Sequence, residues 1–344
     1  MGLFDGAADG TGSAADLAKL LALPVVLVVD CTRQSHSIAA LVSGFKEFRK
    51  DVEVVGVILN RVGSVRHEEM LRAALADIAV HVFGAVERRD DLTLPSRHLG
   101  LVQAAEQEEL ETFLMRAANI VEESIDIDRL LGLTTGHVIG GTEVVRKIPP
   151  LGQNIAVAHD TTFAFIYPHL LDGWRKQGAQ IELFSPLANE KPTSDCDAIY
   201  LPGGYPELHA SMISANECFL SGLKDAASRN VFIYGECGGY MVLGEGLIDS
   251  KGVRHKMAGL LGLETSFANR KLQLGYRVIE LNEDMPFGAK RSTFAAHEFH
   301  YSTVMLEKGI SFVSATDARG EYLGSKGLRA GNVTGSYMHL IDCR

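Results

Sequence analysis

Short apolar runs alternate with helical patterns along the first part of the chain. Three strand-length apolar runs predict buried strands, at residues 24–30, 54–60 and 82–86. Apolar residues recur with helical spacing in the segments between and after them, at residues 38–48, 68–79 and 107–127. Strands that alternate with helices predict a parallel, doubly wound α/β sheet.

The second part of the chain repeats this rhythm after an interruption. Glycine and proline break the pattern over residues 127–153, which we interpret as a linker. Four further strands are predicted, at residues 154–158, 180–184, 198–201 and 231–234, with helices near 163–177 and 215–229. After residue 258 the pattern becomes strand-like and punctuated by glycine. We therefore expect two doubly wound α/β domains, residues 1–126 and 154–344.

Composition restricts the class of protein. Of the 344 residues 46% are hydrophobic, and a formal net charge of −10 without any offsetting basic run argues against a nucleic-acid partner. The five cysteines show no metal-ligand spacing and no close pairs, which fits a reducing cytoplasm. The longest apolar runs have strand length, so we expect no membrane span and a cytoplasmic protein.

Cys237 has the surroundings of a nucleophile. It follows the apolar strand 231–234 and precedes the helical pattern of 240–243, with Gly235 and Gly238 beside it. A strand, a sharp turn, a nucleophile and a helix form the elbow of hydrolases that attack acyl groups. The helix N-terminus would lower the thiol pKa and supply N–H groups for an oxyanion. The alternative is a buried structural cysteine.

A second glycine-rich turn follows the strand that ends at Leu201, in the sequence Pro-Gly-Gly-Tyr-Pro-Glu-Leu-His209. Consecutive glycines at the carboxyl end of a strand leave N–H groups free to face an anion. We expect Gly204 and Gly238 to donate to an oxyanion. An ordinary strand-to-helix turn is the alternative.

A thiol nucleophile needs a base that takes its proton and later protonates the leaving amine. His339, close to the C-terminus, is one candidate, and the cluster of His297 and His300 is another. The spacing does not choose between them. His297-Glu-Phe-His300 does not match the His-Glu-x-x-His metal pattern.

The first half contains weaker signals for a nucleotide. Asp9-Gly-Thr-Gly-Ser13 lacks the lysine of a phosphate-binding loop, and a flexible loop is the simpler reading. Asp30 and Asn60 each close an apolar strand, where ligands bind to parallel sheets. The Asp30 carboxylate would suit Mg²⁺, and the Asn60 amide would suit a hydrogen bond to the edge of a base. A role as a turn residue or helix cap explains each of them equally well.

Four glycine- and histidine-rich segments together resemble the cobyrinic or hydrogenobyrinic acid a,c-diamide synthase family: Gly235-Glu-Cys-Gly-Gly-Tyr-Met, Leu201-Pro-Gly-Gly-Tyr-Pro-Glu-Leu-His, Ala296-His-Glu-Phe-His-Tyr-Ser and Gly335-Ser-Tyr-Met-His. Met1-Gly-Leu-Phe-Asp-Gly and Pro24-Val-Val-Leu-Val-Val-Asp resemble the same family's ATP-binding domain. The resemblance implies a dethiobiotin-synthetase-like ATP domain, of the P-loop type, at 1–126. It implies a class I-type glutamine amidotransferase domain at 154–344.

The resemblance also implies roles for individual residues. Cys237 would be the glutaminase nucleophile and His339 the residue that raises its nucleophilicity. The oxyanion and glutamine region would comprise Gly203, Gly204, Tyr205 and Gly238, and the nucleotide half Asp5, Asp30 and Asn60. The implied reaction uses ATP, Mg²⁺ and L-glutamine to amidate the a and c acetate groups of a corrinoid in cobalamin biosynthesis. A homodimer is compatible with this assignment.

Two departures from the family pattern modify these expectations. The phosphate loop with its lysine, and an acidic residue before Met-Gly-Leu, would lie upstream of Met1, so we expect this chain alone to hydrolyse glutamine better than it forms diamide. Ile341 stands where many class I glutaminases have a glutamate, which favours a Cys-His dyad assisted by a group such as Glu298. The alternatives are an amidase for a related tetrapyrrole or adenosylcobyrinate, and a glutaminase or binding remnant.

Overall fold

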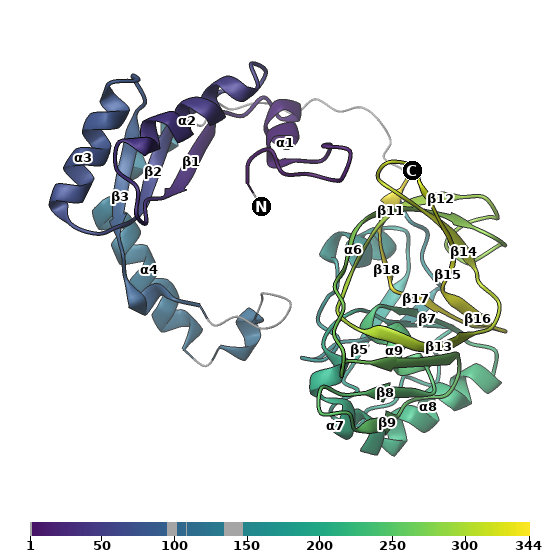
Figure 1. Cartoon of the computed structure of the whole chain (residues 1–344). Helices are drawn as coiled ribbons and strands as arrows, with labels where there is room; N and C mark the ends of the chain where they lie inside the picture. Colours follow the sequence, from purple (N-terminus) through teal and green to yellow (C-terminus); the bar gives the residue numbers. More distant parts are fainter. Residues whose placement is uncertain (1, 95–101, 108, 134–146) are drawn as a thin grey trace. The chain divides into compact units, whose positions relative to one another are not determined.

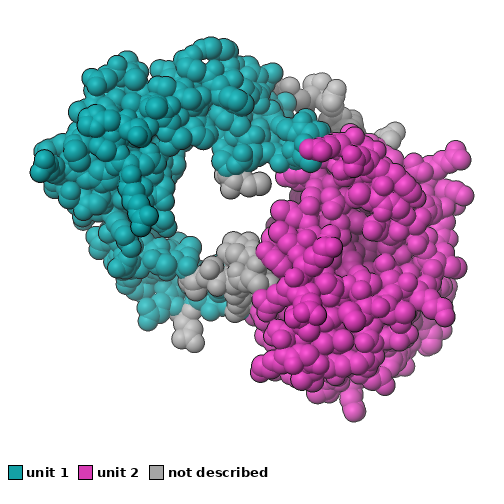
Figure 2. Space-filling view, viewed as in Figure 1, with its two compact units in different colours: residues 1–143 teal, residues 144–344 magenta. Residues whose placement is uncertain are grey.

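The computed structural model describes residues 2–94, 102–107, 109–133 and 147–344 (Figure 1). The chain forms two compact units, Met1–Glu143 and Val144–Arg344 (Figure 2). Both are α/β structures with parallel strands, as the alternating pattern predicts. No helix in the described parts of the chain is both long and apolar enough to cross a membrane.

Unit 1 is built on a three-stranded parallel sheet. Its strands, in the order β1-β2-β3, are β1 (Val25–Asp30), β2 (Val54–Val62) and β3 (Val82–Glu87). The α-helices are α1 (Ala14–Leu20), α2 (Ser37–Phe48), α3 (Val65–Ala76), α4 (Leu110–Ser124) and α5 (Ile127–Leu131), with 3₁₀ turns at Asp90–Leu92 and Ala104–Glu106. The helix predicted at 107–127 begins at Leu110 and ends at Ser124, where the next residue, Ile125, forms a backbone bridge with Gly84.

The core of unit 1 lies between this sheet and two helices. Val57 and Leu59 of β2 and Leu71 of α3 have no exposed surface, and Ile38 of α2 is equally buried. These positions are the apolar ones of the strand and helix patterns, so burial of that face stabilises the arrangement.

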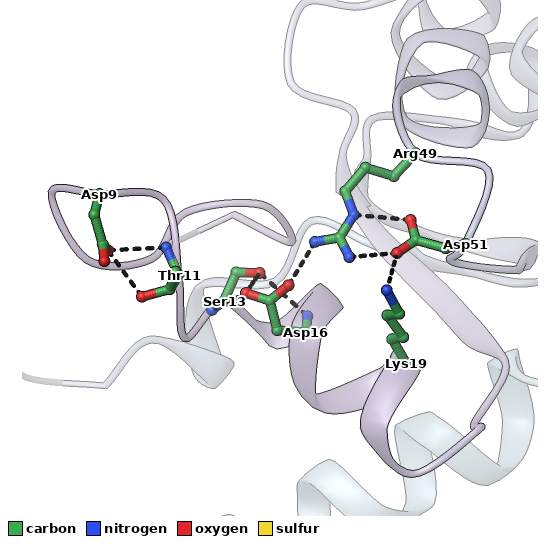
Figure 3. A network of polar contacts seen from close by, with 7 residues as sticks. All are labelled: Asp9, Thr11, Ser13, Asp16, Lys19, Arg49 and Asp51. Atoms are coloured by element: carbon green, nitrogen blue, oxygen red, sulfur yellow. Dashed lines mark hydrogen bonds and ion pairs between the residues drawn. The ribbon is translucent and has the colours of Figure 1, made fainter.

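A polar network fixes α1 to the loop after α2 (Figure 3). Ser13 caps the helix: its hydroxyl accepts from the backbone N–H of Asp16, while the Asp16 carboxylate accepts from the backbone N–H of Ser13 at 3.0 Å. The Arg49 guanidinium pairs with Asp16 at 2.6 Å and with Asp51 at 2.8 Å. The segment 9–13 that contains two glycines is therefore a turn and a helix cap.

Unit 2 is organised around a six-stranded sheet of order β16-β17-β7-β6-β4-β5. All neighbours are parallel except β16 and β17. The strands are β4 (Asn154–Ala158), β5 (Gln180–Phe184), β6 (Ala198–Leu201), β7 (Phe232–Glu236), β16 (Leu328–Ala330) and β17 (Val333–Ser336). The helices are α6 (Pro168–Lys176), α7 (Ala210–Ala215), α8 (Glu217–Ser228) and α9 (Gly238–Leu243), with a 3₁₀ turn at Pro206–Leu208.

Two smaller sheets supply the β-rich part that the sequence predicts. One has the order β13-β10-β8-β9, with β8 (Gly246–Ile248), β9 (Arg254–Lys256), β10 (Gly262–Ser266) and β13 (Thr303–Lys308). The other has the order β15-β14-β11-β12-β18, with β11 (Gln273–Leu281), β12 (Thr293–His300), β14 (Val313–Asp317), β15 (Tyr322–Lys326) and β18 (Met338–Cys343).

The two faces of the central sheet bury different partners. Helices α7, α8 and α9 contribute to one apolar cluster, which includes Ile199 and Ile233 of the sheet. Helix α6 and the five-stranded sheet contribute to the other, which includes Val157 and Trp174. The chain passes from β17 of the central sheet to β18 of the five-stranded sheet through the single residue Tyr337.

The structure refines two predicted boundaries. Within the predicted linker 127–153, residues Ile127–Leu131 are helical, and Ile148 and Leu151 are buried in the core of unit 2; residues 134–146 lie outside the described part. The helix expected over 163–177 begins only at Pro168. A proline disfavours helical backbone at the residue before it and fits the first helical position.

Candidate active site

Cys237 occupies a strained turn between β7 and α9. Its backbone has φ 46° and ψ −101°, a conformation that a non-glycine residue rarely adopts. The strain is held by hydrogen bonds: the N–H of Cys237 donates to the carbonyl of Ser336 at 2.8 Å, and its carbonyl accepts from Met241 at 3.1 Å. This is the elbow that the sequence predicts, and it places a side chain that is only 3% exposed at the carboxyl end of the sheet.

Glycine is required on both sides of the elbow. A Cβ atom on Gly239 would lie 1.9 Å from the carbonyl oxygen of Leu201, at the end of β6. A Cβ atom on Gly235 would lie 2.7 Å from a side-chain methyl of Leu243. The start of α9 therefore packs directly on the neighbouring strand, which only glycine permits.

Gly203 lies between the side chains of Cys237 and His339. A Cβ atom on Gly203 would lie 2.4 Å from Cε1 and 3.2 Å from Nε2 of His339, and 3.4 Å from Cβ of Cys237. The Nε2 edge of the imidazole and the thiol-bearing side chain therefore meet at the same glycine. The fold brings together a thiol and an imidazole that are about a hundred residues apart in the sequence.

Two backbone N–H groups lie at the Cys237 elbow, and one of them contacts the sulfur. The N–H of Gly238 forms a hydrogen bond to the Cys237 side chain. A Cβ atom on Gly238 would lie 3.0 Å from the nitrogen of Gly204, so this second N–H is adjacent. Gly204 itself approaches Thr162 so closely that a Cβ atom would collide with the Thr162 carbonyl oxygen at 1.7 Å. The geometry suits a pair of donors aimed at an oxyanion.

His339 is held in one orientation by its neighbours. It is 2% exposed and pairs across β12 and β18 with His297, whose ring stacks parallel to it at a centroid distance of 4.6 Å. His297 Nε2 is hydrogen-bonded to the hydroxyl of Tyr167. Burial, followed by the nearby His297 and His300, lowers the pKa of His339 to about 3. The imidazole is therefore neutral at physiological pH and able to accept a proton.

The thiol is also neutral in this environment. Burial raises the pKa of Cys237, and the negative charge of Glu207 raises it further, while the N–H of Gly238 acts in the opposite direction. The thiol donates weakly to the carbonyl of Phe299 at 3.9 Å. The helix N-terminus therefore does not by itself produce a resting thiolate, contrary to the lowered pKa that the sequence suggests.

Glu298, expected to assist the dyad, has other partners. Its carboxylate accepts from Arg277 at 2.9 Å and contacts His300 at 3.1 Å. The ring of His300 stacks on Tyr337 at 3.9 Å. The carboxylate beside His339 belongs instead to Glu236, whose Oε2 lies 3.8 Å from Nδ1 of His339. Glu298 is thus paired with Arg277 and His300, and Glu236 lies beside His339.

Glu236 could have been noticed in the sequence. It is the last residue of β7, whose other side chains are apolar or aromatic, and it directly precedes Cys237. A carboxylate that ends a buried strand is an unusual residue, because burial of an unpaired charge is costly.

Tyr205, expected in the glutamine region, serves the packing of the loop. It has no exposed surface, and its ring meets Phe165 edge to face at 5.0 Å. Its N–H donates to the carbonyl of Thr162 at 2.9 Å. The side chain is therefore buried in the core, directly after Gly203 and Gly204 in the sequence.

In unit 1 the structure brings Asp30 and Asn60 together, and Gly2, the hydrogen-bond partner of Asp5, lines a cavity with Asp30. Asp30 and Asn60 are register partners at the ends of β1 and β2, and Arg61 pairs with the Asp30 carboxylate at 3.0 Å. The Asp5 carboxylate accepts from the N–H of Gly2 at 2.6 Å.

A cavity of about 620 Å³ opens at this end of the sheet in unit 1. Its lining includes Thr32, Asn60, Arg61, Arg88 and Arg89. Three guanidinium groups and an amide at the carboxyl ends of parallel strands are suited to an anionic ligand with a polar ring.

The described residues of unit 1 contain no preformed cluster of metal ligands. The described residues contain no group of three or more acidic, histidine or cysteine side chains placed to hold a metal ion. The carboxylate of Asp30, expected to bind Mg²⁺, is half exposed and already paired with Arg61.

The fold of unit 2 and its Cys-His elbow define a glutamine amidotransferase. A family model described as a CobB/CobQ-like glutamine amidotransferase domain matches residues 154–342, and one described as an AAA domain matches residues 8–96. The chain belongs to the hydrogenobyrinate a,c-diamide synthase family. A relative of that name from Brucella anthropi is 56% identical, over 99% of this chain and 78% of the relative.

Two further relatives support the same assignment. Hydrogenobyrinate a,c-diamide synthase of Brucella abortus is 58% identical over 99% of this chain and 78% of its own length. The corresponding protein of Rhizobium meliloti is 54% identical over 99% of this chain and 79% of its own length. A crystal structure of a glutamine amidotransferase from Thermotoga maritima has a TM-score of 0.36 and 16% identity, covering 54% of this chain and 75% of that one.

Proposed function

We propose that this protein amidates the a and c acetate carboxylates of hydrogenobyrinate, with glutamine as the nitrogen donor and ATP as the source of energy. The observation that carries the glutaminase half is the meeting of Cys237 and His339 at Gly203. The names of the relatives support the ring substrate. The match of residues 8–96 to an AAA domain supports the use of ATP.

The glutaminase step uses the groups at the elbow. Cys237 Sγ attacks the side-chain amide carbon of glutamine while its proton passes to Nε2 of His339. The N–H groups of Gly204 and Gly238 hold the resulting oxyanion. The C–N bond then breaks, His339 returns the proton to the leaving ammonia, and a thioester remains. Water attacks this thioester and releases glutamate and the free thiol.

We propose that the ligase step takes place on unit 1. Transfer of the terminal phosphoryl group of ATP to an acetate carboxylate gives an acyl phosphate and ADP. Ammonia displaces phosphate from the acyl carbon and forms the amide. We propose the cavity beside Asn60 and Arg61 for the nucleotide, because an amide side chain recognises a base edge and guanidinium groups attract anions. Asp30 stays a candidate for this half, and Asp5 a weaker one.

The test compares glutamine with ammonium as nitrogen donor in the native chain and in Cys237→Ala. The native chain should release glutamate from glutamine. Cys237→Ala should lose this release and retain any ATP-dependent amidation of hydrogenobyrinate supplied with ammonium, followed by mass spectrometry. Retained glutamine use in Cys237→Ala would overturn the assignment of the nucleophile.

Parallel reactions with cobyrinate and adenosylcobyrinate identify the ring. Amidation of hydrogenobyrinate in preference to both would support the proposal. A preference for either of the others would replace hydrogenobyrinate with that substrate.

A further inference from the structure

Glu236 is a buried carboxylate held by neutral hydrogen-bond donors. It has no exposed surface. Its Oε2 accepts from the hydroxyl of Tyr200 at 2.7 Å, and its Oε1 accepts from the N–H of Leu340 at 3.1 Å. Each oxygen can accept a further hydrogen bond. The carboxylate is therefore fixed in place and has acceptor capacity left.

The neighbouring atom of His339 also lacks a partner. Nδ1 of His339 is buried and forms no hydrogen bond with any residue in the described parts of the chain. It lies 3.8 Å from Oε2 of Glu236, which is within ion-pair range but longer than a hydrogen bond. A ring nitrogen without a hydrogen-bond partner and a carboxylate with acceptor capacity left thus lie within 4 Å of each other.

The chemistry of the thiol supplies a reason for this arrangement. Burial raises the pKa of Cys237 and lowers that of His339, so proton transfer between them creates two charges in a dry site at high cost. A carboxylate at Nδ1 offsets this cost, because it accepts the N–H of the imidazolium that forms.

We propose that Glu236 is the positioning residue of the glutaminase: its carboxylate fixes the His339 ring with Nε2 toward Cys237 and stabilises the imidazolium. The proton moves from Sγ of Cys237 to Nε2 of His339 and does not pass to Glu236. This inference rests on the proposed glutaminase activity and assigns its third group. Ile341, two residues after His339, has no carboxylate to offer.

The other groups near His339 do not replace Glu236. His297 lies flat against the imidazole and presents a ring face, and Tyr167 is bonded to His297. Glu298 and His300 are paired with each other. Among these groups and Cys237, Glu236 alone presents an anionic oxygen within 4 Å of Nδ1.

The central experiment measures glutamine hydrolysis by the full chain in Glu236→Gln. The amide side chain introduced at position 236 keeps the shape of the native side chain and an acceptor for the Tyr200 hydroxyl, but it carries no charge. We expect kcat to fall by roughly 10²- to 10⁴-fold while KM changes by less than about threefold. A kcat within about threefold of the native value would overturn the proposal.

A matched control separates charge at this position from charge elsewhere. Glu307 accepts a hydrogen bond from the buried hydroxyl of Tyr240 at 2.7 Å and makes the same type of contact away from His339. Glu307→Gln should keep its kcat within about threefold of the native value. An equal loss in Glu307→Gln and Glu236→Gln would show that neither effect is specific to His339. A native chain that does not hydrolyse glutamine would instead overturn the proposed function.

The pH profile gives a readout that a structural role would not move. Burial raises the pKa of Glu236 to about 7, against the opposing effects of the N–H of Leu340 and the hydroxyls of Tyr200 and Tyr234. The native rate of Cys237 alkylation by a glutamine-analogue chloroketone should therefore fall as the pH drops through about 7. Glu236→Gln should lack this acidic limb; its persistence would assign the limb to another group and overturn the role of Glu236.

A second variant keeps the proposal testable if Glu236→Gln does not fold. Tyr200→Phe removes one donor to the carboxylate and should raise the pKa of Glu236 further, which shifts the acidic limb toward higher pH. An unshifted limb in folded Tyr200→Phe would contradict the proposal.

Discussion

His297 and His339 are register partners on β12 and β18, and their imidazole planes are parallel to within 1°. Their centroids are 4.6 Å apart, so His297 covers one face of the proposed base. Of the histidines that the sequence offers as alternatives, His339 lies beside Gly203 and Cys237, and His297 lies flat against His339.

Substitution of His297 should distinguish support by ring packing from support by charge. We expect His297→Phe to retain kcat for glutamine hydrolysis within about threefold, because a flat ring still covers His339. His297→Ala should lose about tenfold or more, because the uncovered imidazole leaves its reactive orientation. Steady-state kinetics on both variants provides the measurement. Equal activity of the two variants would show that the stack has no part in orienting His339.

Gly203→Ala should block the contact between the thiol and the base. The added methyl group would lie 2.4 Å from Cε1 of His339, which forces the imidazole away from Cys237. We expect a loss of at least about 10²-fold in kcat with the fold retained. Circular dichroism checks the fold and glutamate release checks the activity.

Gly44→Ala is the matched control for this substitution. A Cβ atom at Gly44, in helix α2, would meet no atom within 4 Å. Alanine there should stabilise the protein by roughly 0.5–1 kcal/mol and leave glutamine hydrolysis unchanged. A loss of activity in Gly44→Ala comparable to that in Gly203→Ala would remove the steric explanation.

The charge of Glu236 should cost stability above its folded-state pKa. The pKa of its carboxyl is raised from 4.5 to about 7, so the folded state binds more protons than the unfolded state between these values. Its stabilising contribution is thus present below pH 4.5 and is lost as the pH rises through 7. The loss amounts to roughly 3 kcal/mol from the shift.

Glu236→Gln removes this dependence. Its free energy of unfolding relative to the native chain should rise between about pH 5 and pH 8, as denaturant titrations at both pH values would measure. A variant that is more stable at pH 8 and less active would show that the carboxylate serves the reaction rather than the fold. A relative stability that falls with pH would contradict the raised pKa.

The network in Figure 3 should stabilise unit 1 in a salt-dependent manner. Arg49 holds the carboxylates of Asp16 and Asp51 together, and these ion pairs are partly exposed. Arg49→Ala should lower the thermal midpoint of unit 1 by a few degrees at low salt and by less at 1 M salt. Arg72→Ala is the control, because it removes a single ion pair with Glu68 within one helix. It should lower the thermal midpoint by less than Arg49→Ala does. Equal shifts in both variants would show that the network acts as separate pairs.

Local patterns were sufficient for most elements of the fold. The apolar runs predicted β1, β2 and β3 to within two residues at each end, because buried parallel strands consist of uninterrupted apolar residues. The glycines around Cys237 predicted the elbow, since no other residue fits that close to a neighbouring strand. Helix α6 begins only at Pro168, because proline disfavours helical backbone at the residue before it. The prediction from the apolar pattern did not take this local rule into account.

The partners of the nucleophile depended on contacts between distant segments. The sequence alone determined that Cys237 ends a strand and begins a helix, because turn chemistry and apolar periodicity act over a few residues. Only the tertiary structure decided that His339 faces it and that Glu236, rather than Glu298, lies behind His339. The reason is physical: the crossing from β17 to β18 and the register of β12 with β18 set these distances. Both arise from sheet packing across the whole unit.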